Sequence, residues 1–225
     1  MIPLRDNIRS RHRPYMNWLL ILVNFLVFFQ ELGLGQRQLN NLFFNLGVVP
    51  ARVLYLLKAG APLEALAVPF FTDMFLHGGW VHILGNMLFL WVFGDNVEDR
   101  LGHFRYLMFY LVVGIIGSIA HVLANPASTV PIIGASGAIA GVLGAYLISF
   151  PRARVLTLLP IFFFVTLVEI PAVVFLIFWF VIQVFNGAAS LGGVANPVAW
   201  WAHIGGFVAG MFLVKLMSPR PVYRW

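Results

Sequence analysis

Long apolar runs recur along this chain of 225 residues, and most charged residues fall between them. The chain is 61% hydrophobic and 10% charged, with a mean hydropathy of +0.91, whereas a water-soluble domain needs far more charged surface. Apolar runs approaching about 20 residues predict helices that cross a bilayer, because a helix satisfies its own backbone hydrogen bonds in lipid. The sequence therefore predicts an all-α, polytopic membrane protein that forms a single domain over residues 1–225.

Six of these runs are interpreted as transmembrane helices. Several are shorter than a full crossing usually needs, which fits spans that border a water-filled site. A further apolar stretch, residues 155–168, is broken at Pro160 and is not counted as a span, and Glu169 is expected at or near the start of the fifth helix. The predicted spans are residues 18–34, 80–93, 106–123, 132–150, 171–185 and 198–217.

The distribution of Lys and Arg predicts the orientation. Four arginines in the leader (residues 1–17), two basic residues in each of the next two loops on that side and three near the C-terminal end make eleven, against Arg37, Arg52 and Lys58 on the other side. The positive-inside rule then places both termini in the cytoplasm. The first loop, residues 35–73, is expected to lie in the outer interface of the membrane. Residues 187–197 are expected to form a mobile flap.

Three of the predicted spans carry polar residues at one depth. The second, fourth and sixth spans run in the same direction, so His82 with Asn86, Ser136 and His203 all fall at roughly 5–12 Å from the outer surface. Ser136 and His203 are each expected about one turn into their spans. Polar residues are costly in hydrocarbon and so suggest a function, and a hydroxyl with an imidazole is the minimum set for a nucleophile activated by a base.

Small residues lie next to both of these positions. Gly137 and Gly141 in the fourth span, and Gly206 and Gly210 in the sixth, each have the spacing that lets helix backbones approach closely. We therefore expect these two helices to pack together and to bring Ser136 to His203. On spacing alone, the alternative that these residues serve only helix packing stays open.

These segments, taken in order, resemble the rhomboid intramembrane serine proteases, and in particular a bacterial member with six spans. The matching segments are HGGWVHILGN at residues 77–86, EDRLG at 98–102, GASG at 134–137 and AHIGG at 202–206, followed by Gly210. A Gly-x-Ser-Gly segment alone is unspecific, but the segments together are a strong signal. The resemblance covers nearly the whole chain, from residue 18 to about residue 217.

The resemblance implies a role for each polar residue. Ser136 would be the nucleophile and His203 the general base and then the general acid. Asn86, His82 and the backbone N–H of Ser136 would form the oxyanion hole. No carboxylate lies in the spans at the depth of His203, which favours a Ser–His dyad over a triad. Supporting positions are assigned to Gly134, Gly137 and His77, and neither a metal nor another cofactor is expected.

Two positions depart from the pattern of some family members. Val68 and Pro69 stand where those members carry a Trp-Arg pair in the first loop, so the anchoring by that pair is in doubt. Ala140 stands where those members carry an aromatic residue that stacks on the catalytic histidine. Some other group must therefore hold the ring of His203.

The implied function is cleavage of transmembrane segments of other membrane proteins near their extracytoplasmic end, in the inner membrane of a bacterium. The partners would be these substrates and the lipid bilayer. Substrate is expected to enter laterally past the fifth span, with its aromatic face of Phe175, Phe178, Trp179 and Phe180. A nucleic-acid partner is not expected, because the basic residues sit at helix ends rather than in one patch.

Three other functions would use some of the same residues. A non-catalytic rhomboid relative would bind client membrane proteins, but such relatives usually lack the serine or the histidine. A transporter could use His82, His203 and Glu169 as a proton path, although no paired repeats are visible. A zinc site formed by His77, His82 and His203 lacks the usual His-Glu-x-x-His pattern. The substrate, the cleavage preference and the oligomeric state are not readable from the sequence.

Overall fold

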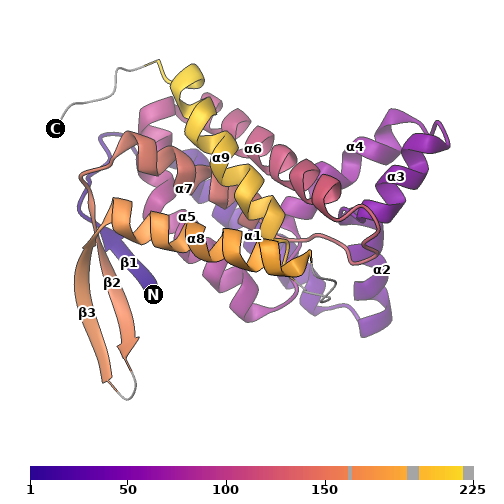
Figure 1. Cartoon of the computed structure of the whole chain (residues 1–225), viewed down its shortest axis with the longest axis horizontal. Helices are drawn as coiled ribbons and strands as arrows, with labels where there is room; N and C mark the ends of the chain where they lie inside the picture. The colour runs from indigo at the N-terminus through magenta and orange to yellow at the C-terminus, as the bar shows by residue number, and fades with distance from the viewer. Residues whose placement is uncertain (162–163, 192–197, 220–225) are drawn as a thin grey trace.

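A computed structural model describes residues 1–161, 164–191 and 198–219 of the chain. Each predicted span contains a helix, and Figure 1 shows α6, α7, α8 and α9 running side by side. Within the described residues, four helices are long and apolar enough to cross a membrane, or five if the bent pair of α4 and α5 is one span. The helices are α1 (Tyr15–Leu32), α5 (Trp80–Leu101), α6 (His103–Ala124), α7 (Ser136–Ser149), α8 (Ala172–Ser190) and α9 (Trp200–Met217).

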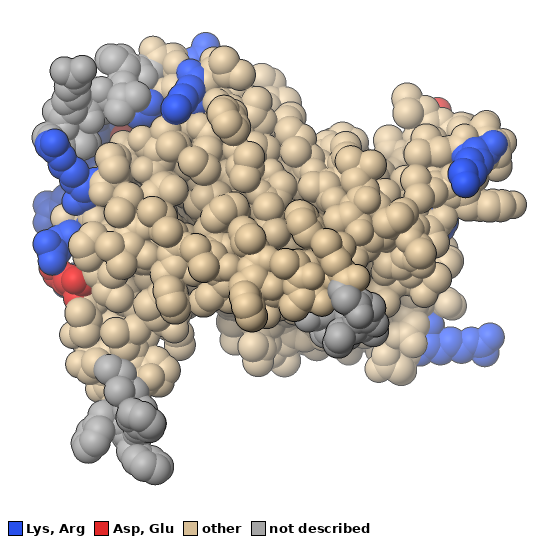
Figure 2. Space-filling model, in the orientation of Figure 1, with Lys and Arg blue, Asp and Glu red and all other residues tan. Residues whose placement is uncertain are grey.

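The surface of the bundle fits a lipid environment. Exposed positions on its helices include Leu22, Phe29, Phe178 and Phe212. Figure 2 shows that, on the face drawn, Lys and Arg gather at the two ends and the surface between them is uncharged. The chain is therefore an integral membrane protein of mostly helical structure. The number of six spans stays a prediction, because α7 is shorter than a usual span.

The helix boundaries differ from the prediction at two places that matter for the site. Helix α7 begins at Ser136 and not at residue 132, so the prediction that Ser136 lies one turn into the helix was wrong. The cause is Gly134, whose φ of 117° is incompatible with a continuing helix. Helix α5 continues past the predicted end at Phe93 to Leu101.

Helices α7 and α9 pack with their backbones in close contact, as the small residues predict. A β-carbon at Gly206 would lie 2.1 Å from the carbonyl oxygen of Gly137, and one at Gly210 would lie 2.0 Å from that of Gly141. Since no side chain fits there, the glycines of α9 set the distance between the two helices. Gly137 is different, because a β-carbon on it would make only an ordinary 3.6 Å contact with Ala202.

The first loop folds into short helices between α1 and α5, at the right end of Figure 1. Val48 forms an antiparallel bridge with Ile132, which ties this loop to the segment that precedes α7. Its location in the outer interface stays a prediction. Its helices are α2 (Gln36–Leu46), α3 (Pro50–Lys58), α4 (Leu63–Thr72) and the 3-10 helix η1 (Asp73–Phe75).

The structure contains a β-sheet, which the all-α prediction did not include. Strands β1 (Ile2–Asp6), β2 (Arg154–Ile161) and β3 (Phe164–Pro171) form an antiparallel sheet in the order β1-β2-β3. Glu169 therefore lies in a strand and not at the helix start, because α8 begins at Ala172. The segment is rich in Val, Thr, Ile and Phe, which favour strands. Its alternation was hidden because both faces of the hairpin are apolar.

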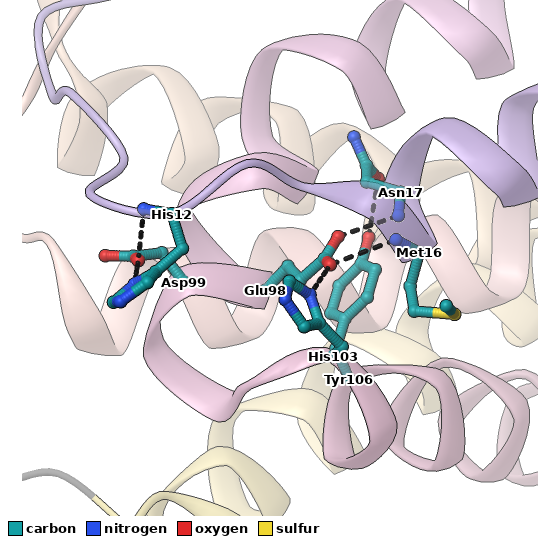
Figure 3. Close-up of polar contacts among 7 residues, drawn as sticks. All are labelled: His12, Met16, Asn17, Glu98, Asp99, His103 and Tyr106. Atoms are coloured by element: carbon teal, nitrogen blue, oxygen red, sulfur yellow. Dashed lines mark hydrogen bonds and ion pairs between the residues drawn. The ribbon is translucent and has the colours of Figure 1, made fainter.

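The EDRLG segment ties the leader to the bundle (Figure 3). The carboxylate of Glu98 accepts the backbone N–H groups of Met16 at 3.0 Å and Asn17 at 2.7 Å, and so caps the first turn of α1. It also contacts the ring of His103, and the hydroxyl of Tyr106 donates to the Asn17 side chain at 2.7 Å. Asp99 next to it accepts the backbone N–H of His12 at 3.1 Å.

Two predictions fall partly outside the described residues. The expected flap at 187–197 includes the end of α8, and its residues 192–197 are not described. Arg220 and Arg224, which were counted for the orientation, also lie outside the described part.

Candidate active site

Ser136 and His203 meet at the start of their helices. Ser136 is the first residue of α7, and His203 lies in the first turn of α9. The Oγ of Ser136 lies 2.8 Å from the Nε2 of His203, which is within hydrogen-bond distance. The close packing of α7 against α9 is what brings two residues so far apart in the sequence into contact.

The second nitrogen of the His203 ring faces Gln183 of α8. The Nδ1 of His203 lies 2.9 Å from the Oε1 of Gln183. The Nε2 of Gln183 donates to the carbonyl of Trp179 at 2.9 Å, so the amide oxygen is the atom turned toward the ring. His203 then donates through Nδ1–H and its Nε2 accepts from the Ser136 hydroxyl. This arrangement requires a neutral imidazole with a free lone pair at the serine.

Two tryptophans flank the same ring. The ring centroids of Trp179 and His203 are 6.0 Å apart with a 35° tilt, and Trp200 meets His203 edge-on at 6.0 Å. His203 is buried, with only 8% of the residue exposed. Since Ala140 cannot stack on His203, we find its ring instead between Gln183, Trp179 and Trp200.

Gly134 allows His82 to approach the segment before Ser136. A β-carbon at Gly134 would lie 2.5 Å from the Nε2 of His82, and the backbone at Gly134 has a φ of 117°. Both facts require glycine at this position. The backbone N–H of Gly134 donates to the carbonyl of Asp73 at 2.8 Å, which fixes the turn.

Asn86 lies one helical turn after His82 on α5, and its side chain is hydrogen-bonded to His77. The Nδ2 of Asn86 lies 3.0 Å from the Nε2 of His77. The Nδ1 of His77 faces the carbonyl of Phe75 at 3.4 Å, so the ring accepts from Asn86 and donates to Phe75. The backbone N–H of His77 donates to the carboxylate of Glu31 at 3.2 Å. An amide carries two N–H groups, so Asn86 keeps one for a ligand.

These side chains line one cavity of about 790 Å³. The structure thus brings together Ser136, His203, His82 and Asn86, while their common depth below the outer membrane surface stays a prediction. His77 lies behind Asn86 and is buried, and Gly137 packs against Ala202 without lining the cavity. The remaining lining includes Gly78 and Gly79 just before α5 and Trp80 at its start, together with Phe89, His121, Trp179, Gln183 and Trp200.

The geometry is suited to acyl transfer. The Ser136 hydroxyl can pass its proton to His203 at 2.8 Å, and Gln183 holds the ring in the tautomer that accepts it. Donors from Asn86 and His82 stand on the same cavity wall, next to the backbone that leads into Ser136. Such donors can stabilise an oxyanion that forms at the attacked carbonyl.

The sequence analysis missed Gln183. It is the one amide in the predicted span 171–185, whose other residues are apolar or aromatic. A polar residue inside a membrane helix is itself a sign of function, so the signal was present. His121, which the sequence analysis does not name as a site residue, also lines the cavity, from α6.

Comparisons with known proteins bear on the family. The Rhomboid domain model matches residues 65–220. RHOMBOID-like protein 4 of Arabidopsis thaliana is 35% identical over 150 residues, covering 67% of this chain and 34% of that protein. Rhomboid protease GluP of Bacillus subtilis (strain 168) is 35% identical over 147 residues, covering 65% of this chain and 28% of that protein. RHOMBOID-like protein 5 of Arabidopsis thaliana is 31% identical over 152 residues, covering 68% of this chain and 44% of that protein.

The chain thus spans less than half the length of these relatives. The match to the domain model extends over more than half of this chain and includes every residue described above for the cavity. On these grounds the chain belongs to the rhomboid family, a family of intramembrane serine proteases.

Proposed function

We propose that this protein is an intramembrane serine endopeptidase that cleaves transmembrane segments of other membrane proteins through a Ser136–His203 dyad. The observation that carries the proposal is the 2.8 Å contact between the Oγ of Ser136 and the Nε2 of His203 in a cavity at the start of α7 and α9. A serine hydroxyl is too basic to attack an amide unaided, and His203 is placed to take its proton.

The reaction would proceed in two steps at this site. Ser136 attacks the scissile carbonyl as His203 takes its proton, and His203 then gives that proton to the leaving amine, which yields an acyl-enzyme. Water activated by the same imidazole releases the second product. The oxyanion of each tetrahedral intermediate would be held by Asn86, His82 and the backbone N–H of Ser136.

The substrate class follows from the place of the cavity in the membrane. A transmembrane helix hides its amides in internal hydrogen bonds, so it must unwind before a carbonyl reaches Ser136. Helix-breaking residues such as Gly or Pro near the cut lower the free energy of that unwinding. The charge bias puts β1 and the end of α9 in the cytoplasm, which we take to be that of a bacterium. The cavity lies at the opposite end of α9, at its start, so we place the cut near the extracytoplasmic end of the substrate.

A covalent probe tests the proposal. A fluorophosphonate should label the purified protein in detergent and in vesicles, and Ser136→Ala should abolish labelling. Ser149→Ala is the matched control, since Ser149 lies on the same helix but outside the cavity. Cleavage of a single-span reporter in vesicles should depend on both Ser136 and His203. A protein that binds the reporter but neither reacts with the probe nor cleaves would instead be a non-catalytic client binder.

A further inference from the structure

The hairpin of β2 and β3 leaves the bundle crosswise to its helices. In Figure 1 the two strands extend away from the start of α8, while α7, α8 and α9 run across the view. If those helices cross a membrane, the hairpin runs along the membrane surface at the end of the bundle where α7 ends and α8 begins. The sequence of the hairpin carries no charged residue from Val155 to Val168.

The strand register divides the side chains of the hairpin between two faces. On the first face, Val155 and Ile170 pack on the core of the bundle, and Thr157 is fully buried. Val168 lies opposite Thr157 on this face, and Leu159 and Thr166 follow farther out. The second face carries Arg154, Leu156, Leu158 and Pro160 of β2, opposite Pro171, Glu169, Leu167 and Val165 of β3.

Beyond the base, apolar side chains are exposed on both faces. Val168 on the first face is 39% exposed, and Leu167 and Val165 on the second face are 58% and 67% exposed. In water, a hairpin that is apolar on both sides is a template for aggregation. Lipid would cover both faces at once.

The open edges of the hairpin determine how deep it can lie. Within the described residues, β1 pairs with β2 only from Val155 to Leu158, and β3 pairs only with β2. The outer edge of β3 therefore presents unpaired backbone groups, which are not tolerated in the hydrocarbon core. The boundary between headgroups and acyl chains meets both demands, since it covers apolar side chains and hydrates the backbone.

Charge at the base of the hairpin complements the lipid headgroups. Arg5 of β1 stands opposite Leu156 on the second face, and Arg154 starts β2. Arg154 forms an ion pair with Glu169 at 3.6 Å, and both side chains are more than half exposed. Figure 2 shows Lys and Arg gathered at the end from which the hairpin leaves, and an uncharged surface from there toward its tip. Basic groups beside an apolar extension are typical of binding to anionic lipid surfaces.

We propose that the β2–β3 hairpin is an interfacial lipid-binding element. It lies at the headgroup boundary of the leaflet next to the N-terminal strand, with Val165, Leu167 and Val168 among the acyl chains and Arg5 and Arg154 on anionic phospholipid. The backbone N–H of Ala172 donates to the carbonyl of Ala153 at 2.8 Å across the base of the hairpin. Lipid binding here would therefore hold the start of α8, the helix that carries Gln183, at the membrane surface.

Nitroxide labels at single cysteines test the position of the hairpin, and the chain has no cysteine of its own. Leu167→Cys and Val165→Cys remove exposed side chains only, so the fold should tolerate both. In vesicles of phosphatidylcholine with phosphatidylglycerol, both labels should collide with oxygen and be shielded from a water-soluble nickel chelate. Arg9→Cys, in the exposed leader, is the control that the nickel reagent should reach. A label at Glu169→Cys, at the base of the hairpin, should show nickel access between that of the control and that of positions 165 and 167.

Two results would overturn the proposal. One is that the nickel reagent reaches the labels at positions 165 and 167 as readily as the label at position 9, which would place the hairpin in water. The other is spin–spin broadening at 167 that disappears on dilution with unlabelled protein, which would show that a second copy covers the hairpin. The lipid preference is tested separately. If phosphatidylglycerol draws the labels at positions 165 and 167 deeper into the bilayer, Arg5→Gln with Arg154→Gln should remove that effect. An equal effect of phosphatidylglycerol on label depth in this variant would reject these arginines as the headgroup contacts.

Discussion

Gln183 and His203 are joined through the Oε1 of the amide and the Nδ1 of the ring, 2.9 Å apart, on the side of the imidazole away from Ser136. The amide is itself fixed by its bond to the carbonyl of Trp179. A neutral amide thus occupies the place that a carboxylate holds in a Ser-His-Asp triad. It can set the tautomer and the direction of the ring without adding a charge to the membrane interior.

Gln183→Leu is expected to lower kcat by roughly 10–100-fold with little change in KM, because the ring loses its orienting acceptor while the substrate contacts stay. Gln183→Glu restores an acceptor at the same distance and should recover part of the rate. The measurement is steady-state cleavage of a reporter in vesicles, together with the rate of fluorophosphonate labelling. Equal kcat for wild type and Gln183→Leu would show that the tryptophans alone hold the ring.

Asn86→Ala should lower the cleavage rate by roughly 10²-fold or more, if its amide donates to the oxyanion. The control is His77→Gln, which keeps an acceptor near the Nδ2 of Asn86 but lies behind it and away from the cavity. That variant should lose much less activity. Rates for the two variants that fall by the same factor would mean that Asn86 acts by packing and not by donating to the reaction centre.

Gly206 of α9 and Gly137 of α7 should respond differently to a methyl group. Gly206→Ala places a β-carbon 2.1 Å from the Gly137 carbonyl oxygen and should destabilise the protein by about 1–3 kcal/mol, since a backbone atom cannot move aside easily. Gly137→Ala makes an ordinary contact of 3.6 Å with Ala202 and should change the unfolding midpoint little. Thermal unfolding in detergent compares the two. A larger loss for Gly137→Ala would contradict the described packing of α7 on α9.

Much of this site was predictable from the sequence, and the missing parts have physical causes. Ser136, His203, His82 and Asn86 could be singled out because polar residues stand out in apolar spans, and the structure places all four on one cavity. The start of α7 could not be read, because the positive φ of Gly134 depends on the contact with His82 and the Asp73 carbonyl. The hairpin was not predicted, because a strand with two apolar faces shows no alternation of apolar and polar residues.

Asp6 predicts a pH dependence of stability. Burial raises the pKa of the Asp6 carboxyl in β1 from 3.8 to about 7, and the nearby Asp95 adds to the rise while the hydrogen bond from Tyr146 opposes it. Asn96 also donates to Asp6, at 2.9 Å. Between about pH 4 and 7 the unfolded chain has lost this proton and the folded chain retains it, so the free energy of unfolding should fall as the pH rises through this range.

Above about pH 7 the carboxyl is ionised in both states, and its contribution to the slope ends. Asp6→Asn removes the titration, and its unfolding curves should depend less on pH over the same window. Denaturant or thermal unfolding at several pH values measures the difference. A slope that is unchanged in Asp6→Asn would assign the titration to another group.

Lateral entry of substrate requires α8 to move away from α5. The rings of Phe89 on α5 and Phe175 on α8 lie 6.2 Å apart, and Phe89 also lines the cavity. In a chain without cysteine, Phe89→Cys with Phe175→Cys puts one thiol on each helix, and oxidation, with a short dithiol linker where the gap needs one, can tether the two helices. The oxidised protein should lose most cleavage of a transmembrane reporter and regain it on reduction, while small fluorophosphonates should still label Ser136.

The matched control tethers α8 on its other side. The rings of Phe180 and Phe207 lie 4.5 Å apart, so Phe180→Cys with Phe207→Cys would link α8 to α9. This tether should leave reporter cleavage largely intact, because it does not close the path between α5 and α8. Full turnover by the oxidised α5–α8 pair would reject lateral entry at this position. Equal inhibition by both tethers would mean that α8 must move as a whole, in which case the path of the substrate is not confined to the α5 side.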